Sequence, residues 1–469
     1  MIKNFIKENT VLIGLCFLAL LRLISLGLYP LMDKTEARYA EISREMVMRN
    51  DWITPWLEGK PFWAKPPLSM WLVNISYKIF GINEFSARFP SFLLAILSMF
   101  LIFILARQLK DKEFGSRVVL ILFSMGLFFI IAGGVMTDPA LCFSMTLSLV
   151  SFILMMKGIN VKIFRYLFFV SLGLSMLAKG PIGIVLTFMP IFFWTLIYSE
   201  WKNLFKQLFF IPGIILMILI FLPWYLVAES KTPGFLKYYF IGEHFLRYTV
   251  KGWKGDLYGT PNSAPFGSIW LYALPTFLPW LFLYFAKLKS FAKILRENLF
   301  KDKNLAFLFL WILCPLIFFS FSKNILITYL LPATPAFAIL TAYLLDKINF
   351  SLKKIIIISM IVPFISVIAL IFVLPEIGVQ RSQKTILRKY NNGDMKIYYV
   401  DNMPYSAYFY GQNNTELISS KNLDSKFEEL LNDNKKYYFV VEKDKLHIIN
   451  ILSNYADFEE QIGEYQIFK

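Results

Sequence analysis

Three acidic residues stand where a carboxylate could do chemistry, each beside a long apolar stretch. Asp33 and Glu36 follow the first such stretch, and Asp138 lies between a Gly-Gly pair and Pro139. A carboxylate at these places could take a proton from a hydroxyl or stabilise developing positive charge. The same residues also suit helix starts, because Asp33-x-x-Glu36 has the spacing of a capping box and Asp138 could cap a helix that begins at Pro139. Both interpretations stay open on spacing alone.

A group of basic residues and one tyrosine is expected on the same side of a membrane as these acids. Lys65 precedes Pro66-Pro67, which favours an extended backbone and gives the ammonium a defined direction. At an effective dielectric constant of about 20, an ammonium about 4 Å from a phosphate oxygen contributes roughly 4 kcal/mol of attraction before desolvation. Several cations together could therefore hold a phosphate, although each alone is also typical of a side chain that reaches to the membrane interface. The predicted phosphate-binding residues are Lys65, Arg38, Lys179, Arg247, Lys323 and Tyr329.

Long apolar stretches must position these residues. The chain of 469 residues is 57% hydrophobic and has a mean hydropathy of +0.56, which is far more apolar than a soluble protein of this size. We predict an α-helical polytopic membrane protein with about 11–13 transmembrane helices. The eleven clearest spans are 10–30, 88–108, 117–133, 138–157, 163–178, 181–199, 207–228, 267–286, 304–321, 325–345 and 354–375.

The net charge of +16 arises mainly from Lys and Arg in short loops between these spans, where they fix the orientation in the membrane. We therefore predict no nucleic-acid partner. If the spans alternate, the basic loops all fall on one side, which the positive-inside rule makes cytoplasmic. The opposite, outer side then receives the segments that carry the candidate residues. These segments are 31–87, 134–138, 179–181, 229–266, 322–325 and the C-terminal tail.

The composition changes after residue 375, where apolar runs shorten and Asn, Asp, Lys and Glu dominate. We predict a transmembrane domain at 1–375 and a small extracytoplasmic α/β domain at 376–469. In the second domain, Met395–Asp401 and Lys436–Glu442 are typical of buried strands, and Ser420–Asn432 of an amphipathic helix between them.

The segment 31–87 also carries a set of motifs in a fixed order. It resembles the GT-C type integral-membrane glycosyltransferases typified by the lipid A aminoarabinose transferases and, more distantly, the dolichyl-phosphate-mannose-protein mannosyltransferases. The resemblance rests on Thr35–Met46 (TEARYAEISREM), Asn50-Asp51-Trp52, Lys65-Pro66-Pro67-Leu68, Phe80-Gly81 and Phe85–Pro90 (FSARFP).

The resemblance implies a functional acid in the first outer segment and a second one at Asp138. Aligned on Arg-Tyr-Ala-Glu-Ile, the family's Asp-Glu pair falls on Thr35 and Glu36, so its aspartate is absent there. Asp33 and Glu36 therefore both remain candidates. The resemblance supports Lys65 most directly among the cations, because the family carries Lys-Pro-Pro at this place.

Glu243-His244 resembles a Glu-His-x-x-Arg segment of the aminoarabinose transferases, in which the histidine and a glutamate directly before Lys-Pro-Pro hold a metal. Here that glutamate position is Ala64, so one ligand is missing and we predict no metal site, with a divalent metal kept as the alternative. The expected role of Glu243 and His244 is to orient a substrate, and packing at the interface is the other interpretation of His244.

The resemblance implies an inverting glycosyltransferase of the bacterial cytoplasmic membrane. It would transfer a sugar from a polyprenyl-phosphate donor to lipid A, another envelope glycan or a protein on the outer side. The alternative is a transporter or flippase of polyprenyl-linked sugars, although nearly all charges lie in loops rather than in the spans where a transporter would place them.

Overall fold

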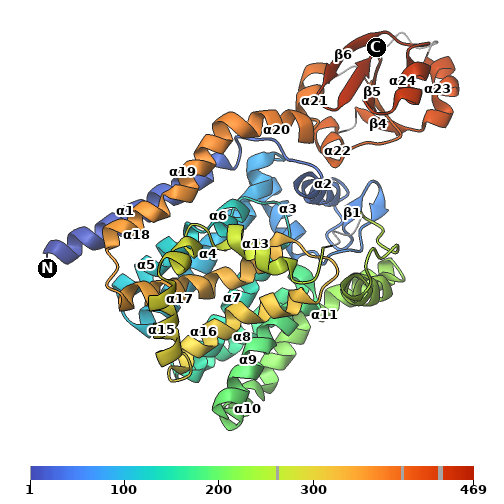
Figure 1. The fold of residues 1–469 in the computed structure, drawn as a ribbon. Coiled ribbons are helices and arrows are strands. Elements are labelled where there is room, and N and C mark those ends of the chain that lie inside the picture. The colour runs from blue at the N-terminus through green and yellow to red at the C-terminus, as the bar shows by residue number, and fades with distance from the viewer. Residues whose placement is uncertain (1, 260–263, 392–395, 413, 431–436) are drawn as a thin grey trace.

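The computed structural model describes residues 2–259, 264–391, 396–412, 414–430 and 437–469. It is a bundle of long helices that carries a small sheet-containing unit at its C-terminal end (Figure 1). The first helix, α1 (Ile2–Ser25), runs beside α18 (Leu352–Ser359) and α19 (Ile361–Ile368) along one edge of the bundle.

Eight helical segments of the described chain are long and apolar enough to cross a membrane. They coincide with eight of the predicted spans, and the break expected between 178 and 181 lies at Gly180. These segments are α4 (Glu84–Leu109), α7 (Asp138–Met156), α8 (Val161–Lys179), α9 (Pro181–Tyr198), α11 (Ile211–Lys231), α16 (Lys303–Ser320), η2 (Ile327–Ala333) with α17 (Thr334–Lys347), and α18 and α19 with η3 (Ala369–Val373) and α20 (Leu374–Arg381).

The remaining three predicted spans are helical but shorter or broken. The apolar part of α1 covers Thr10–Ser25. The stretch 117–133 forms α5 (Lys112–Phe123) and α6 (Gly126–Ile131), and 267–286 forms α13 (Ser268–Phe277) and α14 (Leu281–Ala286).

The two broken spans meet at their breaks. The backbone N–H of Gly126 donates to the carbonyl of Leu278 at 2.8 Å, and the indole N–H of Trp280 donates to the hydroxyl of Ser124 at 3.0 Å. In an apolar environment every freed polar group needs such a partner. Each break therefore supplies hydrogen-bond partners to polar groups at the other break.

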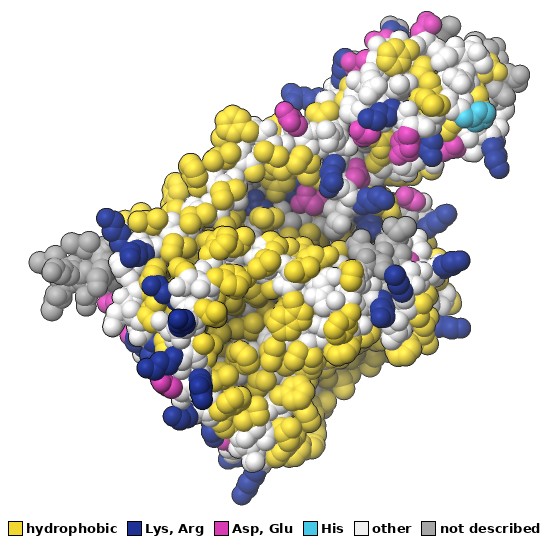
Figure 2. Space-filling view, viewed as in Figure 1, with side chains coloured by type: hydrophobic (Ala, Val, Ile, Leu, Met, Phe, Trp, Pro, Cys, Tyr) yellow, Lys and Arg dark blue, Asp and Glu magenta, His cyan; other side chains and the backbone are white. Residues whose placement is uncertain are grey.

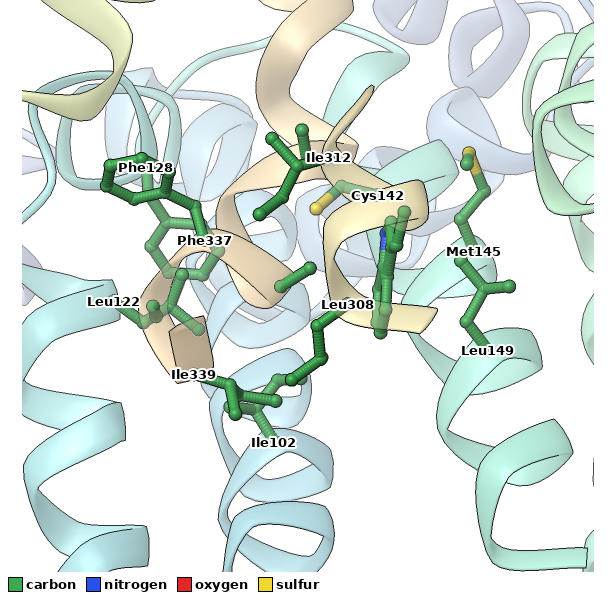
Figure 3. Close-up of a cluster of buried hydrophobic side chains, with 14 of the residues drawn as sticks. Ile102, Leu122, Phe128, Cys142, Met145, Leu149, Leu308, Ile312, Phe337 and Ile339 are labelled. Carbon is green, nitrogen blue, oxygen red and sulfur yellow. The ribbon is translucent and has the colours of Figure 1, made fainter. Parts of the chain in front are cut away.

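The main apolar cluster lies inside the bundle and joins most of its helices. Figure 3 shows part of it, with side chains from α4, α5, α6, α7, α16 and α17 pointing toward one another. The labelled residues are Ile102, Leu122, Phe128, Cys142, Met145, Leu149, Leu308, Ile312, Phe337 and Ile339. This packing fixes the ends of α7, α8 and η2, which carry candidate residues.

The first connecting segment (31–87) is folded rather than extended. It contains α2 (Thr35–Met48), a hairpin of β1 (Trp56–Leu57) and β2 (Lys60–Pro61), and α3 (Leu68–Phe80). Apolar side chains of α2, including Ala37, Ile42 and Met46, are buried in a separate cluster with α3 and with Phe409 of the C-terminal unit. The second connecting segment (229–266) contains η1 (Lys237–Leu246) and α12 (Arg247–Thr249).

The interpretation of Asp33 as a helix cap is wrong. The residue before α2 is Lys34, and within the described chain no side chain caps this helix. The Asp33 carboxylate instead accepts hydrogen bonds from the backbone N–H of Ser406 at 3.0 Å and from its hydroxyl. Asp138 is likewise the first residue of α7 and not its cap, which is Thr137.

The described residues of the C-terminal unit form a five-stranded mixed sheet in the order β4-β3-β5-β7-β6. The predicted strands correspond to β3 (Lys396–Val400) and β5 (Tyr437–Glu442), which pair in parallel, and the predicted helix to η4 (Ser420–Asn422) and α23 (Leu423–Leu430). The sequence analysis did not identify β4 (Thr415–Ile418), β6 (Phe458–Ile462) and β7 (Tyr465–Phe468). β4 and β6 are short and mostly exposed, so they lack the apolar pattern of β3 and β5. β7 is mostly buried, but it has only 4 residues and follows a polar run.

Shorter helices complete the chain. They are α10 (Trp201–Leu208), α15 (Leu288–Asn298), α21 (Lys384–Tyr390), α22 (Tyr405–Gly411) and α24 (Leu446–Leu452). The helical stretch that begins at Leu352 continues to Arg381, past the expected boundary at residue 375.

The surface of the bundle is strongly apolar. Figure 2 shows a wide hydrophobic face over the helices, whereas Lys and Arg gather toward the ends of the bundle and on the C-terminal unit. Large apolar side chains such as Leu219, Phe282 and Phe372 are more than 60% exposed. Such a surface requires lipid around it, as expected of a polytopic membrane protein.

Candidate functional site

Lys65, Glu243 and Arg247 form a charged centre between the two connecting segments. The Lys65 ammonium lies 2.8 Å from the Glu243 carboxylate, and the Arg247 guanidinium donates to both oxygens of that carboxylate at 3.0 Å. Arg247 also lies 3.5 Å from Asp256. The Glu243 side chain is only 2% exposed. Burial alone would raise the pKa of Glu243, but the positive charges of Lys65 and Arg247 outweigh burial and hold that pKa below its usual range.

The helix η1 positions this centre. Glu243 and Arg247 are four residues apart, so they lie on the same face of one helical stretch. Lys65 approaches from the loop that follows β2, and its ammonium also donates to the carbonyl of Ala64 at 2.6 Å. The centre therefore exists only when two segments distant in sequence pack together.

A second ion pair joins Asp138 and Lys179. The Lys179 ammonium lies 2.7 Å from the Asp138 carboxylate and 4.6 Å from the centre of the Tyr329 ring. Asp138 begins α7 and Lys179 ends α8, and both are largely buried. Gly180, with φ +77°, allows the sharp turn by which α9 follows.

His244 lies between the two ion-paired groups. Burial, and then the positive charges of Lys65 and Lys179, lower the pKa of His244 to about 3, so its imidazole is neutral at neutral pH. The ring packs edge-on against Tyr239, with ring centres 4.7 Å apart. Its Nε2 atom is buried and has no hydrogen-bond partner among the described residues.

Several other polar atoms around the site are buried without a partner in the described chain. They are Trp63 Nε1, Arg247 Nε, Asn324 Oδ1 and Thr328 Oγ1. Buried polar groups are normally paired with protein, water or a ligand. Those beside the ion pairs lie where charged side chains already gather, so a polar ligand could bind here.

The structure thus brings together seven of the predicted residues and places the others elsewhere. The seven are Lys65, Asp138, Lys179, Glu243, His244, Arg247 and Tyr329. Asp256 and Tyr238 also belong to the site, and sequence analysis missed both because neither stands in a recognisable motif.

Glu36, Arg38 and Lys323 have other surroundings. Glu36 lies 2.9 Å from the fully buried Arg88. Arg38 donates to the carbonyl of Tyr258 at 2.8 Å and packs over aromatic rings. The Lys323 side chain is exposed, although its backbone N–H contacts the carbonyl of Tyr248, the residue after Arg247.

Asp33 belongs to the contact with the C-terminal unit. Burial raises the pKa of Asp33 to about 6, against the effect of its hydrogen bonds to Ser406. Nearby, the hydroxyl of Tyr410 accepts a hydrogen bond from the backbone of Leu31 at 2.8 Å and donates to Glu84 at 2.9 Å. Asp33 therefore helps to hold the C-terminal unit on the first connecting segment.

The residues present do not fit a bound metal. Glu243 is occupied by two cations, the position before Lys65 is Ala64, and the described residues contain no cluster of three or more His, Cys, Asp or Glu side chains. A divalent cation at His244 would also be repelled by the ammonium of Lys65, whose positive charge already lowers the pKa of His244.

Comparisons with known proteins agree with this architecture. The dolichyl-phosphate-mannose-protein mannosyltransferase family matches residues 10–239. An undecaprenyl phosphate-alpha-4-amino-4-deoxy-L-arabinose arabinosyl transferase from Yersinia enterocolitica is 33% identical over 392 residues, which cover 79% of this chain and 68% of the relative. A second such transferase from Proteus mirabilis is 33% identical over 345 residues, and there the chain spans only 59% of the relative's length.

Solved structures show the same fold. The crystal structure of ArnT from Cupriavidus metallidurans bound to undecaprenyl phosphate superposes with a TM-score of 0.82 at 19% identity and covers 98% of both chains. The apo oligosaccharyltransferase of Archaeoglobus fulgidus superposes with a TM-score of 0.55 at 13% identity, over 94% of this chain and 71% of that one.

Proposed function

Because the chain belongs to the family of membrane glycosyltransferases that includes the aminoarabinose arabinosyl transferases, we propose that it transfers a sugar from a polyprenyl-phosphate donor to an acceptor. The acceptor would be lipid A, another envelope glycan or a protein. The reaction would take place at the outer face of the bacterial cytoplasmic membrane. The transmembrane part would carry the reaction, and the C-terminal domain would cover it from outside.

The observation that carries this proposal is the pair of neighbouring ion pairs at the loop end of the bundle. Lys65, Arg247 and Lys179 bring three cations to one buried place, and each is held by a carboxylate. In such surroundings a phosphate would gain several charge-assisted hydrogen bonds. It would compete with Glu243 and Asp138 for their cations, so binding the donor would also release a carboxylate.

This exchange gives the carboxylates a role in the reaction. Lys65 and Lys179 would stabilise the negative charge that develops on the leaving polyprenyl phosphate, which needs no general acid. The acceptor oxygen would attack the anomeric carbon, the bond from that carbon to the phosphate oxygen would break, and the acceptor proton would pass to a carboxylate. A single displacement of this kind inverts the anomeric configuration.

Asp138 is the acid that the geometry favours for this role. It lies 2.7 Å from the Lys179 ammonium, whereas Asp33 bonds to Ser406 and Glu36 pairs with Arg88. The release of Asp138 by the donor phosphate would make its carboxylate available only when a donor is bound. Asp33 and Glu36 stay as the two other candidates, and Arg38, Lys323, Tyr329 and His244 as further donor contacts.

Release of free polyprenyl phosphate tests the proposal. The purified protein is placed in proteoliposomes with undecaprenyl-phosphate sugars and extracts of bacterial envelope as acceptor, and the products are followed by mass spectrometry. We expect sugar-dependent release that Lys65→Ala abolishes and that Lys60→Ala, which changes an exposed lysine of the same segment, leaves intact. Movement of intact donor across the membrane without release would instead support the transporter.

A further inference from the structure

The indole N–H of Trp63 is a buried donor that has no acceptor among the described residues. Seven of the eleven tryptophans donate their indole N–H to a defined oxygen, among them Trp56 to Asp51 at 3.1 Å and Trp71 to the carbonyl of Trp52 at 2.6 Å. All eleven lie in the described chain, and Trp63 is the one whose indole nitrogen is buried and has no partner in that part of the chain. Native structures rarely leave such a donor unsatisfied, so a group outside the described chain is expected to accept this hydrogen bond.

Trp63 is held in a fixed position beside the charged centre. Its backbone N–H donates to the hydroxyl of Tyr258 at 3.0 Å, and its ring lies 6.0 Å from the ring of Tyr238. The hydroxyl of Tyr238 in turn reaches the Glu243 carboxylate at 3.4 Å, and Glu243 pairs with Lys65. The indole is thus connected to the predicted phosphate-binding lysine both through these contacts and along the chain, two residues away.

The chemistry of this position suits a sugar. In a polyprenyl-phosphate sugar the anomeric carbon is bonded to a phosphate oxygen, so the sugar must lie directly beside the group that Lys65 would bind. An indole offers a flat apolar face for the C–H groups of a sugar ring and a donor at its edge. Because the indole N–H can only donate, its partner must be an oxygen with a free lone pair, not a protonated amine.

We propose that Trp63 binds the sugar ring of the donor, with the ring against the indole face and one sugar oxygen accepting the Nε1–H hydrogen bond. This inference rests on the proposed function and adds the residue that recognises the sugar rather than the phosphate. It makes Trp63 a specificity residue, since a donor with no acceptor oxygen at that ring position loses the contact.

Binding measurements without an acceptor test this proposal. The full-length protein in nanodiscs is titrated with undecaprenyl phosphate and with undecaprenyl phosphate that carries mannose or 4-amino-4-deoxy-L-arabinose. Trp63→Phe keeps an aromatic face and removes the N–H, and Trp63→Ala removes both. Trp56→Phe is the matched control in the hairpin that precedes Trp63, because its N–H bonds to Asp51 within the protein.

We expect Trp63→Phe to weaken binding of the better glycosylated lipid by about three- to tenfold, the range of one neutral hydrogen bond. Trp63→Ala should weaken it further. Binding of bare undecaprenyl phosphate should be unchanged in both variants, and Trp56→Phe should bind all lipids as the parent does. The titration is repeated with donors that each lack one ring hydroxyl. The donor without the hydroxyl that contacts Trp63 should bind the parent protein as weakly as the complete donor binds Trp63→Phe. This donor should also bind the parent and Trp63→Phe equally well.

Three results would overturn the inference. Equal weakening for bare undecaprenyl phosphate would assign Trp63 to the lipid or phosphate, and weakening seen only when an envelope acceptor is added would assign it to the acceptor. Unchanged binding in Trp63→Ala would mean that water satisfies the indole. If the parent protein binds none of these lipids, the proposed function itself fails, which the parent titration shows without any variant.

Discussion

Lys65 and Glu243 are 178 residues apart in the sequence and form an ion pair of 2.8 Å inside the protein. The carboxylate is 2% exposed and also bonds to Arg247, so two cations from different segments share one buried anion. This pair ties the first connecting segment to the second and thereby builds the site.

Removal of the shared carboxylate should destabilise the protein. Loss of one partner from a buried ion pair typically costs about 3–5 kcal/mol, because it leaves an unpaired charge. We expect Glu243→Gln to lower the midpoint of thermal unfolding in detergent clearly. Glu464→Gln, which breaks an exposed pair with Lys443, should leave it within error. Equal shifts in the two variants would contradict the structural role of Glu243.

Asp138→Asn should impair chemistry more than donor binding. If Asp138 takes the proton of a hydroxyl acceptor, its neutral replacement should lower kcat by about 10²- to 10⁴-fold. Binding of the undecaprenyl-phosphate sugar should be retained, because the asparagine no longer competes for Lys179. Single-turnover transfer and donor titration are measured for Asp138→Asn, Asp33→Asn and Glu36→Gln. If the loss of kcat is largest for Asp33→Asn or Glu36→Gln, that residue and not Asp138 is the base.

Stability should depend on pH through Asp33. Its pKa is raised from 3.8 to about 6 in the folded protein, so between about pH 4 and pH 6 the folded state binds the proton more tightly than the unfolded state does. The contribution of Asp33 to stability is therefore favourable at low pH and is lost as the pH rises toward 6. Asp33→Asn removes this proton and can still accept the N–H of Ser406.

The comparison is made by thermal unfolding of both proteins at several pH values from 4 to 7. We expect the parent to lose stability relative to Asp33→Asn as the pH increases over this range. Because the other carboxylates are common to both proteins, their effects cancel in the difference. Parallel curves would show that the carboxyl of Asp33 has an ordinary pKa.

Gly180 should not tolerate a side chain. A Cβ at this residue would collide with the hydroxyl of Tyr239 and lie 2.8 Å from His244 Nε2. Gly158 has a similar φ of +75° but nothing within 4 Å of its Cβ position, so Gly158→Ala carries only the backbone strain, about 1–2 kcal/mol. Gly180→Ala should therefore unfold at a lower temperature than Gly158→Ala and transfer sugar more slowly, and equal behaviour would argue against close packing at His244.

Chelation should leave activity intact. The residue before Lys65 is Ala64, and the carboxylate of Glu243, next to His244, is already paired with Lys65 and Arg247. The described residues hold no group of three or more His, Cys, Asp or Glu side chains that could bind a metal. Transfer is measured after exhaustive treatment with a chelator and again after zinc is added. A loss that zinc alone restores would show that a metal participates.

Local apolar patterns were sufficient to predict the helices of the membrane part. Each predicted span depends on its own run of about 20 apolar residues, and all of them are helical, because in a bilayer a helix satisfies its backbone without any other segment. The paired breaks at Ser124 and Leu278 could not be predicted in this way, since each is stabilised by contacts to the other. The strands β3 and β5 were found for their apolar runs, and the polar edge strand β6 was not.

The sequence by itself determined which residue types are available at the loop end of the bundle, including Lys65 before two prolines, Asp138 at a helix start and Glu243 beside His244. Spacing could not decide which acid faces which cation, because those choices depend on how segments far apart in the chain pack. The tertiary structure assigned Glu243 to Lys65 and Arg247, and Asp138 to Lys179. Asp33, the first acid that the sequence suggested, instead contacts Ser406 in the tertiary structure. A buried carboxylate is stable only where the fold supplies its hydrogen bonds, and for Asp33 that place is the contact with the C-terminal unit.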